Sequence, residues 1–233
     1  MKNNKDIVVY VAKAKFKFGK LGLDIVRQYF ENIIVIPYDE CVQGDEGKSR
    51  IRHKLKTLEY DYLISFWSEL YIKKEELEKA KKGAINIHPA PPEHPGLGMF
   101  TFLRIFPHLR AHHGVTLHEI DAKMDHGQIY RTTRFSVENK DDWELVNDTS
   151  AISLQFLEDA CIKLSTGCSS RDLQNEECRN EKWKDTFYTS TMEQEWISHL
   201  PAEHPTRRLD CISLNTLLYN EFGAHHDSLI ETL

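Results

Sequence analysis

Asn86 and His88 form a polar pair inside an apolar stretch, residues 84–88, which reads Ala-Ile-Asn-Ile-His. Such a stretch predicts a short buried strand, and residues two apart on a strand project from the same face. A carboxamide can donate hydrogen bonds to an oxygen that becomes negative, and an imidazole can carry a proton near neutral pH. The pair therefore predicts a site that stabilises charge and moves protons.

Prolines place this pair at the end of its strand. Pro89 follows His88 directly, and Pro91 and Pro92 come soon after. Because proline has no backbone N–H to donate, the strand must give way to a loop at this point. In an open α/β sheet, ligands bind in the crevice outside the carboxyl ends of the strands, so we expect the crevice next to His88.

Asp125 is the third candidate, in a turn at residues 121–127 that reads Asp-Ala-Lys-Met-Asp-His-Gly. Strands are predicted on both sides of the turn, at residues 115–120 and 128–135, and a hairpin would bring Asp125 into the crevice. On the first of these strands Thr116 and His118 alternate with apolar residues, so the polar face of the site continues there. A carboxylate within reach of the pair can serve as general base or acid.

Strands and helices alternate along the chain, which predicts a Rossmann-like α/β fold with a mostly parallel sheet and right-handed crossovers. Further strands are predicted at residues 7–11, 33–36 and 62–66. Helices are predicted at residues 19–30, 51–58, 73–82, 98–108 and 141–166, with a polar loop at 44–50. Gly167 is placed to cap the last of these helices.

Two regions follow from this pattern. Residues 1–167 are predicted to form the catalytic domain, and residues 168–233 a small C-terminal region with two short helices, at 193–200 and 209–219. The C-terminal region is too short for a robust core of its own, so we expect it to pack on the catalytic domain or on a partner chain.

Composition narrows the class of protein. The 233 residues are 40% hydrophobic and 28% charged, with a net charge of -6, which is typical of a globular protein and disfavours nucleic acid as a partner. No apolar run is long enough to cross a bilayer, and no signal-peptide pattern follows the first residues. We therefore expect a cytoplasmic protein without a membrane partner.

Metal chemistry is disfavoured as well. The five cysteines lack Cys-x-x-Cys spacing and are predicted to be reduced thiols. The twelve histidines include no His-Glu-x-x-His motif, so no metal site is expected. Lysines at positions 13, 15, 17 and 20 follow the first strand, where the Gly-x-Gly-x-x-Gly spacing is absent. They either meet a substrate phosphate or form a solvated face.

Four motifs occur in an order and spacing that resemble a known family. They are Asn86-x-His88-Pro89, the loop Pro-Pro-Glu-His-Pro-Gly at 91–96, Gly-Val-Thr-Leu-His at 114–118, and Asp125-x-Gly127-x-Ile129. Together, over residues 7–164, they resemble the 10-formyltetrahydrofolate-dependent formyltransferases. The loop resembles that of the sugar N-formyltransferases, which act on nucleotide-linked amino sugars, although His94 stands where that group usually has tyrosine.

The resemblance implies roles for the three candidates. Formyl transfer to an amine passes through a tetrahedral intermediate with a negative oxygen, which Asn86 and His88 would stabilise. Asp125 would move the proton, directly or through water, with assistance from His88. The alternative is that His88 and Asp125 are a structural pair, with Asn86 capping a loop.

The resemblance also implies two binding sets. The pterin of 10-formyltetrahydrofolate would lie after the third strand and beside the turn, against Phe66, Trp67, Leu70, Asp121 and Met124, although Trp67 could equally belong to the core. The acceptor would be a nucleotide-linked 4-amino-4,6-dideoxyhexose, dTDP-linked by first choice and GDP-linked by second. Its candidate contacts are Lys13, Tyr71, Pro92, His94 and Gly96.

Other activities remain as alternatives. Glycinamide ribonucleotide, or another small amine, is the second choice of acceptor. Methionyl-tRNA formyltransferase is disfavoured because its further basic domain has no counterpart here. A non-catalytic folate or nucleotide-sugar binding module is the least favoured, because Asn86, His88 and Asp125 are all present. A homodimer is expected, with candidate contacts at Trp183, Phe187, Tyr188, Trp196, Leu217 and Leu218.

Overall fold

The computed structural model describes residues 5–13, 17–37, 45–68, 70–96, 112–189, 191–192, 195 and 198–199. The predicted helix at 98–108 lies outside the described residues, as does the one at 209–219, and most of the one at 193–200 does too. In the described part of the chain, no helix combines the length and the apolar character needed to cross a bilayer.

Six strands form one sheet in the order β2-β1-β3-β4-β5-β6. Strands β1 (Ile7–Ala12), β2 (Asn32–Pro37), β3 (Tyr60–Phe66) and β4 (Ala80–His88) pair in parallel. Strand β5 (His112–Glu119) runs antiparallel to both of its neighbours, β4 and β6 (Ile129–Ser136). Only β5 is reversed among the six, so the prediction of a mostly parallel α/β sheet is confirmed.

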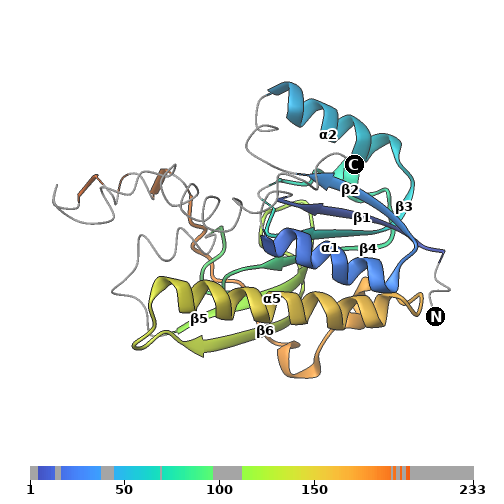
Figure 1. Ribbon diagram of the computed structural model, residues 1–233. Helices are drawn as coiled ribbons and strands as arrows, with labels where there is room; N and C mark the ends of the chain where they lie inside the picture. The colour runs from blue at the N-terminus through green and yellow to red at the C-terminus, as the bar shows by residue number, and fades with distance from the viewer. Residues whose placement is uncertain are drawn as a thin grey trace.

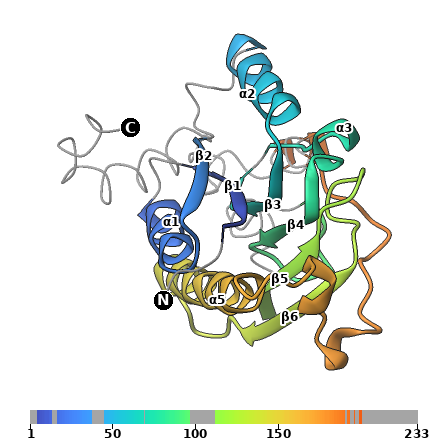
Figure 2. The ribbon, with the colours of Figure 1, turned by 90° about the vertical axis from the view of Figure 1, so that its right-hand side faces the viewer.

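Helices cover both faces of this sheet. Helices α1 (Lys17–Tyr29) and α5 (Asp142–Leu164) pack against one face, where side chains such as Tyr10, Ile64 and Ile87 form the larger core. Helix α2 (Asp45–Thr57) and the single turn α3 (Lys74–Leu77) lie on the other side, as Figure 2 shows. There Val9, Leu63 and Leu55 belong to a second core. The result is a three-layer α/β/α arrangement (Figure 1).

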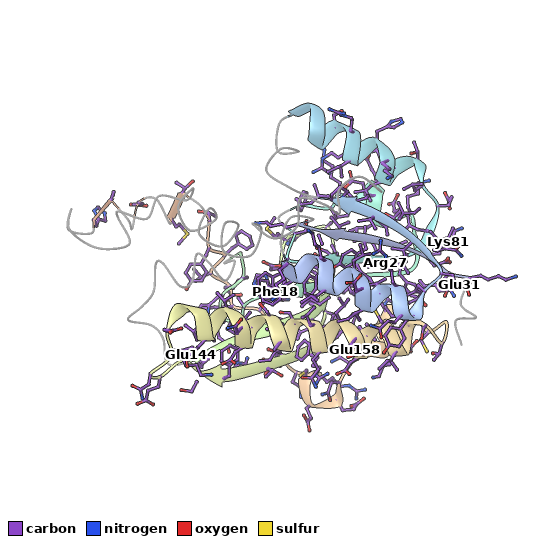
Figure 3. The ribbon with its side chains drawn as sticks, in the orientation of Figure 1. Phe18, Arg27, Glu31, Lys81, Glu144 and Glu158 are labelled. Atoms are coloured by element: carbon purple, nitrogen blue, oxygen red, sulfur yellow. The ribbon has the colours of Figure 1, made fainter. Side chains whose placement is uncertain are left out.

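Helix α5 has clear start and stop signals. Its N-cap Asp141 accepts a hydrogen bond from the Glu144 N–H at 2.8 Å, and the Glu144 carboxylate accepts one from the Asp141 N–H at 2.9 Å. In Figure 3 Glu144 lies in the first turn of α5, and Glu158 lies further along, where the Tyr29 hydroxyl of α1 donates to it at 3.0 Å. Gly167, at φ 86°, reverses the chain just after the helix.

Two local predictions were wrong. The predicted loop at 44–50 is helical from Asp45, so α2 begins six residues before the predicted start. The predicted helix at 73–82 shrinks to one turn, α3, because β4 begins at Ala80 and pairs there with Tyr60 of β3. High helix propensity in this segment is overridden by the hydrogen bonds that extend the sheet.

After α5 the described chain returns across the sheet. The 3-10 turns η3 (Ser170–Leu173) and η4 (Glu176–Cys178) pack beside β4 and β6. The chain then runs without regular structure over residues 181–188, which we call the strap. Two backbone hydrogen bonds tie the strap to the loop after β4, from the Lys184 N–H to the Pro92 carbonyl at 3.0 Å and from the Tyr188 N–H to the Pro95 carbonyl at 2.9 Å.

Candidate functional site

Asn86 and His88 sit at the C-terminal end of β4, on the sheet face opposite Ile85 and Ile87. The antiparallel register with β5 pairs Asn86 with His118 and His88 with Thr116. Residues paired in this way share a face, so these four polar side chains gather at one place. The Asn86 Nδ2 and His118 Nε2 atoms are 3.1 Å apart.

The turn between β5 and β6 carries Asp125 back to this place. Asp125 has φ 44°, a left-handed conformation that tightens the turn. Asp121 stabilises the turn through its carboxylate, which accepts hydrogen bonds from the Lys123 N–H at 2.8 Å and from His126 Nδ1 at 2.7 Å. A Cβ at Gly127 would lie 2.1 Å from the Glu119 carbonyl oxygen, so only glycine allows this close approach.

Asp125 lies between two buried histidines. Its Oδ2 atom is 3.5 Å from His88 Nδ1, and its Oδ1 atom is 3.5 Å from His118 Nε2. The Gly96 N–H donates to Oδ2 at 2.9 Å. Asp125 is 8% exposed and His88 5%, so the carboxylate and the rings interact largely out of water. We call Asn86, His88, His118 and Asp125 the polar cluster.

The environment separates the charges of His88 and Asp125. Burial alone would raise the pKa of the Asp125 carboxyl, but the two histidines and the Gly96 N–H outweigh burial and hold that pKa well below its ordinary value. Burial lowers the pKa of His88, against the opposing attraction of Asp125. At neutral pH the site therefore holds an ionised carboxylate beside a neutral imidazole.

His88 is suited to receive a proton. Both groups that face its ring nitrogens are acceptors, the Asp125 carboxylate and the His94 carbonyl, which lies 3.4 Å from Nε2. A neutral imidazole has one N–H and can serve only one of them, whereas the imidazolium has two and can serve both. A proton that arrives on His88 would thus be stabilised from two sides.

His118 joins Asn86 to Asp125. Its Nδ1 atom lies 2.7 Å from the Glu119 carbonyl oxygen, which can only accept, so Nδ1 carries a proton. In the neutral ring, Nε2 then accepts from one N–H of the Asn86 carboxamide. In the protonated ring, Nε2 faces the Asp125 carboxylate as a donor.

Asn86 keeps hydrogen-bonding capacity for a ligand. His118 takes at most one of its two amide N–H donors. Its Oδ1 atom is buried and has no hydrogen-bond partner among the described residues. A buried acceptor without a partner is costly, and an amine that entered the site would supply the missing donor. The free N–H and the free carbonyl suit a substrate that has both an oxygen and an amine at the reacting centre.

The strap brings Trp183 onto the polar cluster. The indole ring stands edge-to-face with His88, with ring centroids 5.8 Å apart, and with His118 at 4.9 Å. Its Nε1–H donates to the Gly127 carbonyl at 2.8 Å. Trp183 therefore contacts both histidines and the Asp125 turn at once.

A cavity of about 740 Å³ opens beside the cluster. One wall is formed by Tyr71 and the β5–β6 turn, including Met124 and Asp125, and the other by the strap, including Trp183 and Phe187. This volume is in the usual range for a small-molecule site. Among the described residues, no group of three or more histidine, cysteine or acidic side chains is arranged to hold a metal ion.

The sequence matches the family model described as formyl transferase over residues 3–153, more than half of the chain. The chain belongs to this family. The prediction of a formyltransferase is thus confirmed, and the match covers Asn86, His88 and Asp125. Comparison with curated proteins finds no match.

Solved structures of other formyltransferases share the fold. WlaRD, a sugar 3N-formyl transferase crystallised in the presence of dTDP and 5-N-formyl-THF, has a TM-score of 0.59 and 17% identity over 82% of this chain and 72% of its own. PseJ from Anoxybacillus kamchatkensis has a TM-score of 0.57 and 16% identity over 88% of this chain and 98% of its own. Its structure contains UDP-4,6-dideoxy-4-formamido-L-AltNAc and tetrahydrofolate. Glycinamide ribonucleotide transformylase 1 from Symbiobacterium toebii has a TM-score of 0.55 and 15% identity over 71% of this chain and 90% of its own.

The residues predicted to hold the cosubstrate divide into two groups. Met124 lines the cavity, and the Asp121 carboxylate is used within the turn. Phe66, Trp67 and Leu70 are instead buried in the two cores of the formyltransferase. Phe66 is fully buried, and Trp67 stacks on Phe66 and donates from Nε1 to Ser153 at 3.1 Å. None of these three side chains lines the cavity.

The residues predicted to contact the acceptor are also spread out. Tyr71 lines the cavity, with its hydroxyl donated to the Ala122 carbonyl. Pro92 is buried beneath the strap, and the half-buried His94 ring packs against Tyr188. Gly96 binds Asp125, and Lys13 follows β1 and does not line the cavity.

Two residues of the site were missed. His118 was placed on the polar face of the site but given no role, and Trp183 was considered only as a dimer contact. The alternation with Thr116 was a usable signal for His118, because a polar residue on the buried face of a strand needs a partner. For Trp183 the local sequence offers no such signal, since residues 181–188 show no periodicity.

Proposed function

We propose that this formyltransferase transfers the formyl group of 10-formyltetrahydrofolate to the amine of a nucleotide-linked 4-amino-4,6-dideoxyhexose. A dTDP-linked sugar is the first choice and a GDP-linked sugar the second. The observation that carries the proposal is the ionised Asp125, which lies between His88 and His118 at the wall of a cavity. Asn86 lies in the same cluster and has unused hydrogen-bonding capacity.

The polar cluster can serve each stage of such a transfer. The sugar amine attacks the formyl carbon, a new C–N bond forms, and the formyl oxygen becomes negative. The free N–H of Asn86 is the donor for that oxygen. The amine proton passes to the carboxylate and imidazole of Asp125 and His88, and the folate N10, when its bond to carbon breaks, takes a proton back from them.

The cavity fits the chemistry of the cosubstrate. Tyr71, Met124 and Phe187 are 39%, 42% and 39% exposed and all line the cavity, so they offer apolar surface to a flat ring. Three lysines also line it, and none forms an ion pair with another described residue: Lys123, Lys182 and Lys184. Apolar surface and unpaired positive charge together suit a ring system with an anionic tail, such as a folate.

The acceptor class rests on the loop and on the relatives. The rigid loop at 91–96 resembles that of sugar N-formyltransferases, and PseJ was solved with a 4,6-dideoxy-4-formamido sugar nucleotide. Another relative, an N-formyltransferase from Helicobacter canadensis, was solved with dTDP-3-aminofucose and folinic acid. A single pyrophosphate needs only a local basic patch, which agrees with the net charge of -6.

An acceptor panel tests the proposal. The protein is incubated with 10-formyltetrahydrofolate and dTDP-, GDP- and UDP-linked amino sugars or glycinamide ribonucleotide, and the formylated products are identified by mass spectrometry. Formylation of a nucleotide-linked amino sugar, abolished in Asp125→Asn, is expected. Formylation of glycinamide ribonucleotide alone would replace the proposal with the purine-type alternative. Folate binding without transfer to any acceptor would favour a non-catalytic binding module.

We also propose that the enzyme is a homodimer. Of the candidate contacts, Trp196, Leu217 and Leu218 lie outside the described residues, whereas Trp183 and Tyr188 pack within their own chain. Phe187 stays 39% exposed and remains available to a partner. Sedimentation at micromolar concentration should give the mass of two chains, and a monomer would contradict the proposal.

A further inference from the structure

We propose that Trp183 is a positioning residue for formyl transfer, which covers the polar cluster, keeps His88 out of water and holds the Asp125 turn in place. This inference rests on the proposed catalytic roles of His88 and Asp125. It goes beyond them because it makes the strap, which follows the matched region at 3–153, part of the site.

Three contacts of one side chain carry the inference. The indole touches His88 on β4 and His118 on β5 with its ring, and it binds the Gly127 carbonyl with its only polar atom. A buried indole N–H usually finds a hydrogen-bond partner, and here that partner is the Gly127 carbonyl. Here the side chain joins the paired strands β4 and β5 to the turn that carries Asp125, so its loss would loosen the turn relative to the two strands.

The indole also separates the cavity from the imidazole. Trp183 and Asp125 line the cavity, whereas His88 and Asn86 do not. Without the indole, water from the cavity would reach the His88 ring. Because electrostatic interactions are stronger out of water, this cover would strengthen the hydrogen bonds that the cluster makes to the reacting atoms.

The strap is held firmly enough to act in this way. Apart from its two backbone hydrogen bonds, Glu181 forms an ion pair with Arg134 of β6 at 3.0 Å. Arg134 also pairs with Glu93 of the loop after β4, at 2.7 Å. Gly96 lets the strap approach, since a Cβ there would lie 2.3 Å from the Tyr188 carbonyl oxygen.

The charged state of His88 gives a readout that a merely structural role would not move. The ionisable side chains that act on His88 are Asp125 from the turn and His118 from β5, and the His94 backbone carbonyl faces the ring from the loop. The strap contributes the uncharged indole of Trp183. Burial is the largest cause that lowers the pKa of His88. Opening the site should therefore raise that pKa toward 6.5, its ordinary value, or above it beside Asp125.

The experiment compares Trp183→Ala, Trp183→Phe and Phe187→Ala with the wild type in the full chain. The His88 pKa is measured by NMR titration of the histidine ring carbons, and its signal is assigned by its absence in His88→Asn. Trp183→Ala should raise the His88 pKa and lower kcat by about tenfold, since small misplacements near the reacting atoms cost rate. Trp183→Phe, which keeps a ring but loses the Gly127 hydrogen bond, should keep the pKa near the wild-type value.

Phe187→Ala is the matched control, because it removes another aromatic ring from the strap without a ring contact to either histidine. It should leave the His88 pKa unchanged. An unchanged pKa in Trp183→Ala, or an equal rise in Phe187→Ala, would overturn the inference. So would a Trp183→Ala enzyme faster than wild type, because the indole would then obstruct the acceptor. The titration needs no substrate, so its failure is distinguishable from failure of the acceptor panel.

Discussion

The two walls of the cavity are built in different ways. One wall includes the turn between β5 and β6, which carries Asp125 and continues into the paired strands that hold Asn86 and His118. The other wall is the strap, which has no regular structure and reaches the site through two backbone hydrogen bonds and a few side chains. The first wall is joined to the polar cluster, and the second supplies Trp183, which covers the cluster.

This difference teaches how rigidity is divided within the site. Strand pairs share many backbone hydrogen bonds, so Asn86, His88 and His118 should separate only when the sheet itself opens. The strap depends on contacts that each contribute about 1 kcal/mol, so it should open locally at a lower free energy. Catalytic geometry is thus placed on the firm wall, and access is left to the weaker one.

Replacing Asp125 should have the largest effect. Asp125→Asn keeps the shape of the side chain but removes the charge between the two histidines, so kcat should fall by about a hundredfold or more. The same loss is expected for Asn86→Ala and His88→Asn, while folding stays largely intact. Steady-state kinetics with circular dichroism tests this, with exposed Asp24→Asn of α1 as the control. A near-normal rate in Asp125→Asn would contradict the catalytic role assigned to Asp125.

Gly96→Ala should disrupt the contact between the loop after β4 and the strap. Gly96 has φ 81°, and a Cβ there would lie 2.3 Å from the Tyr188 carbonyl. Gly167→Ala is the matched control, with φ 86° and no neighbour closer than 3.7 Å. Urea unfolding should show a loss of about 1 kcal/mol for Gly167→Ala and about 1–3 kcal/mol more for Gly96→Ala. Equal losses would mean that the strap moves away from the added methyl group at no cost in free energy.

Acid should destabilise the folded protein in two steps, first through His88 and then, at lower pH, through Asp125. The folded-state pKa of His88 lies below 6.5, so the unfolded chain binds more protons below that pH and stability falls as the pH drops. The pKa of Asp125 is also depressed, so the stability that it contributes is present above its unfolded value and is lost at still lower pH. Unfolding free energies measured from pH 7 to 5 should decline less steeply in His88→Asn. Parallel curves would contradict the low pKa of His88.

Arg134→Ala should have the smallest effect, although it removes both ion pairs between β6, the loop and the strap. Arg134 is 31% exposed, and exposed pairs contribute little, so the expected loss of unfolding free energy is below about 1 kcal/mol. Arg179→Ala, which removes only the exposed pair with Glu176, is the control. A loss of several kcal/mol in Arg134→Ala alone would show that the strap is held mainly by charge.

Local pattern alone was sufficient for much of the first wall. The apolar runs at 7–11 and 62–66 became β1 and β3 because a buried strand needs a continuous apolar sequence. Asn86 and His88 could be found because their spacing of two and the prolines after them act within a few residues. The helix predicted at 73–82 was wrong because pairing with β3 outweighed propensity, and pairing is not visible in the segment itself.

Tertiary structure alone decided the rest of the site. His118 became a member of the polar cluster only through the register that sets it opposite Asn86, a residue 32 positions earlier in the chain. Trp183 reached His88 because the strap returns across the sheet after α5. Asn86, His88 and Asp125 could be predicted from the sequence because each is constrained by its neighbours in the chain. Their partners His118 and Trp183 could not, because contacts between distant segments depend on how the whole chain packs.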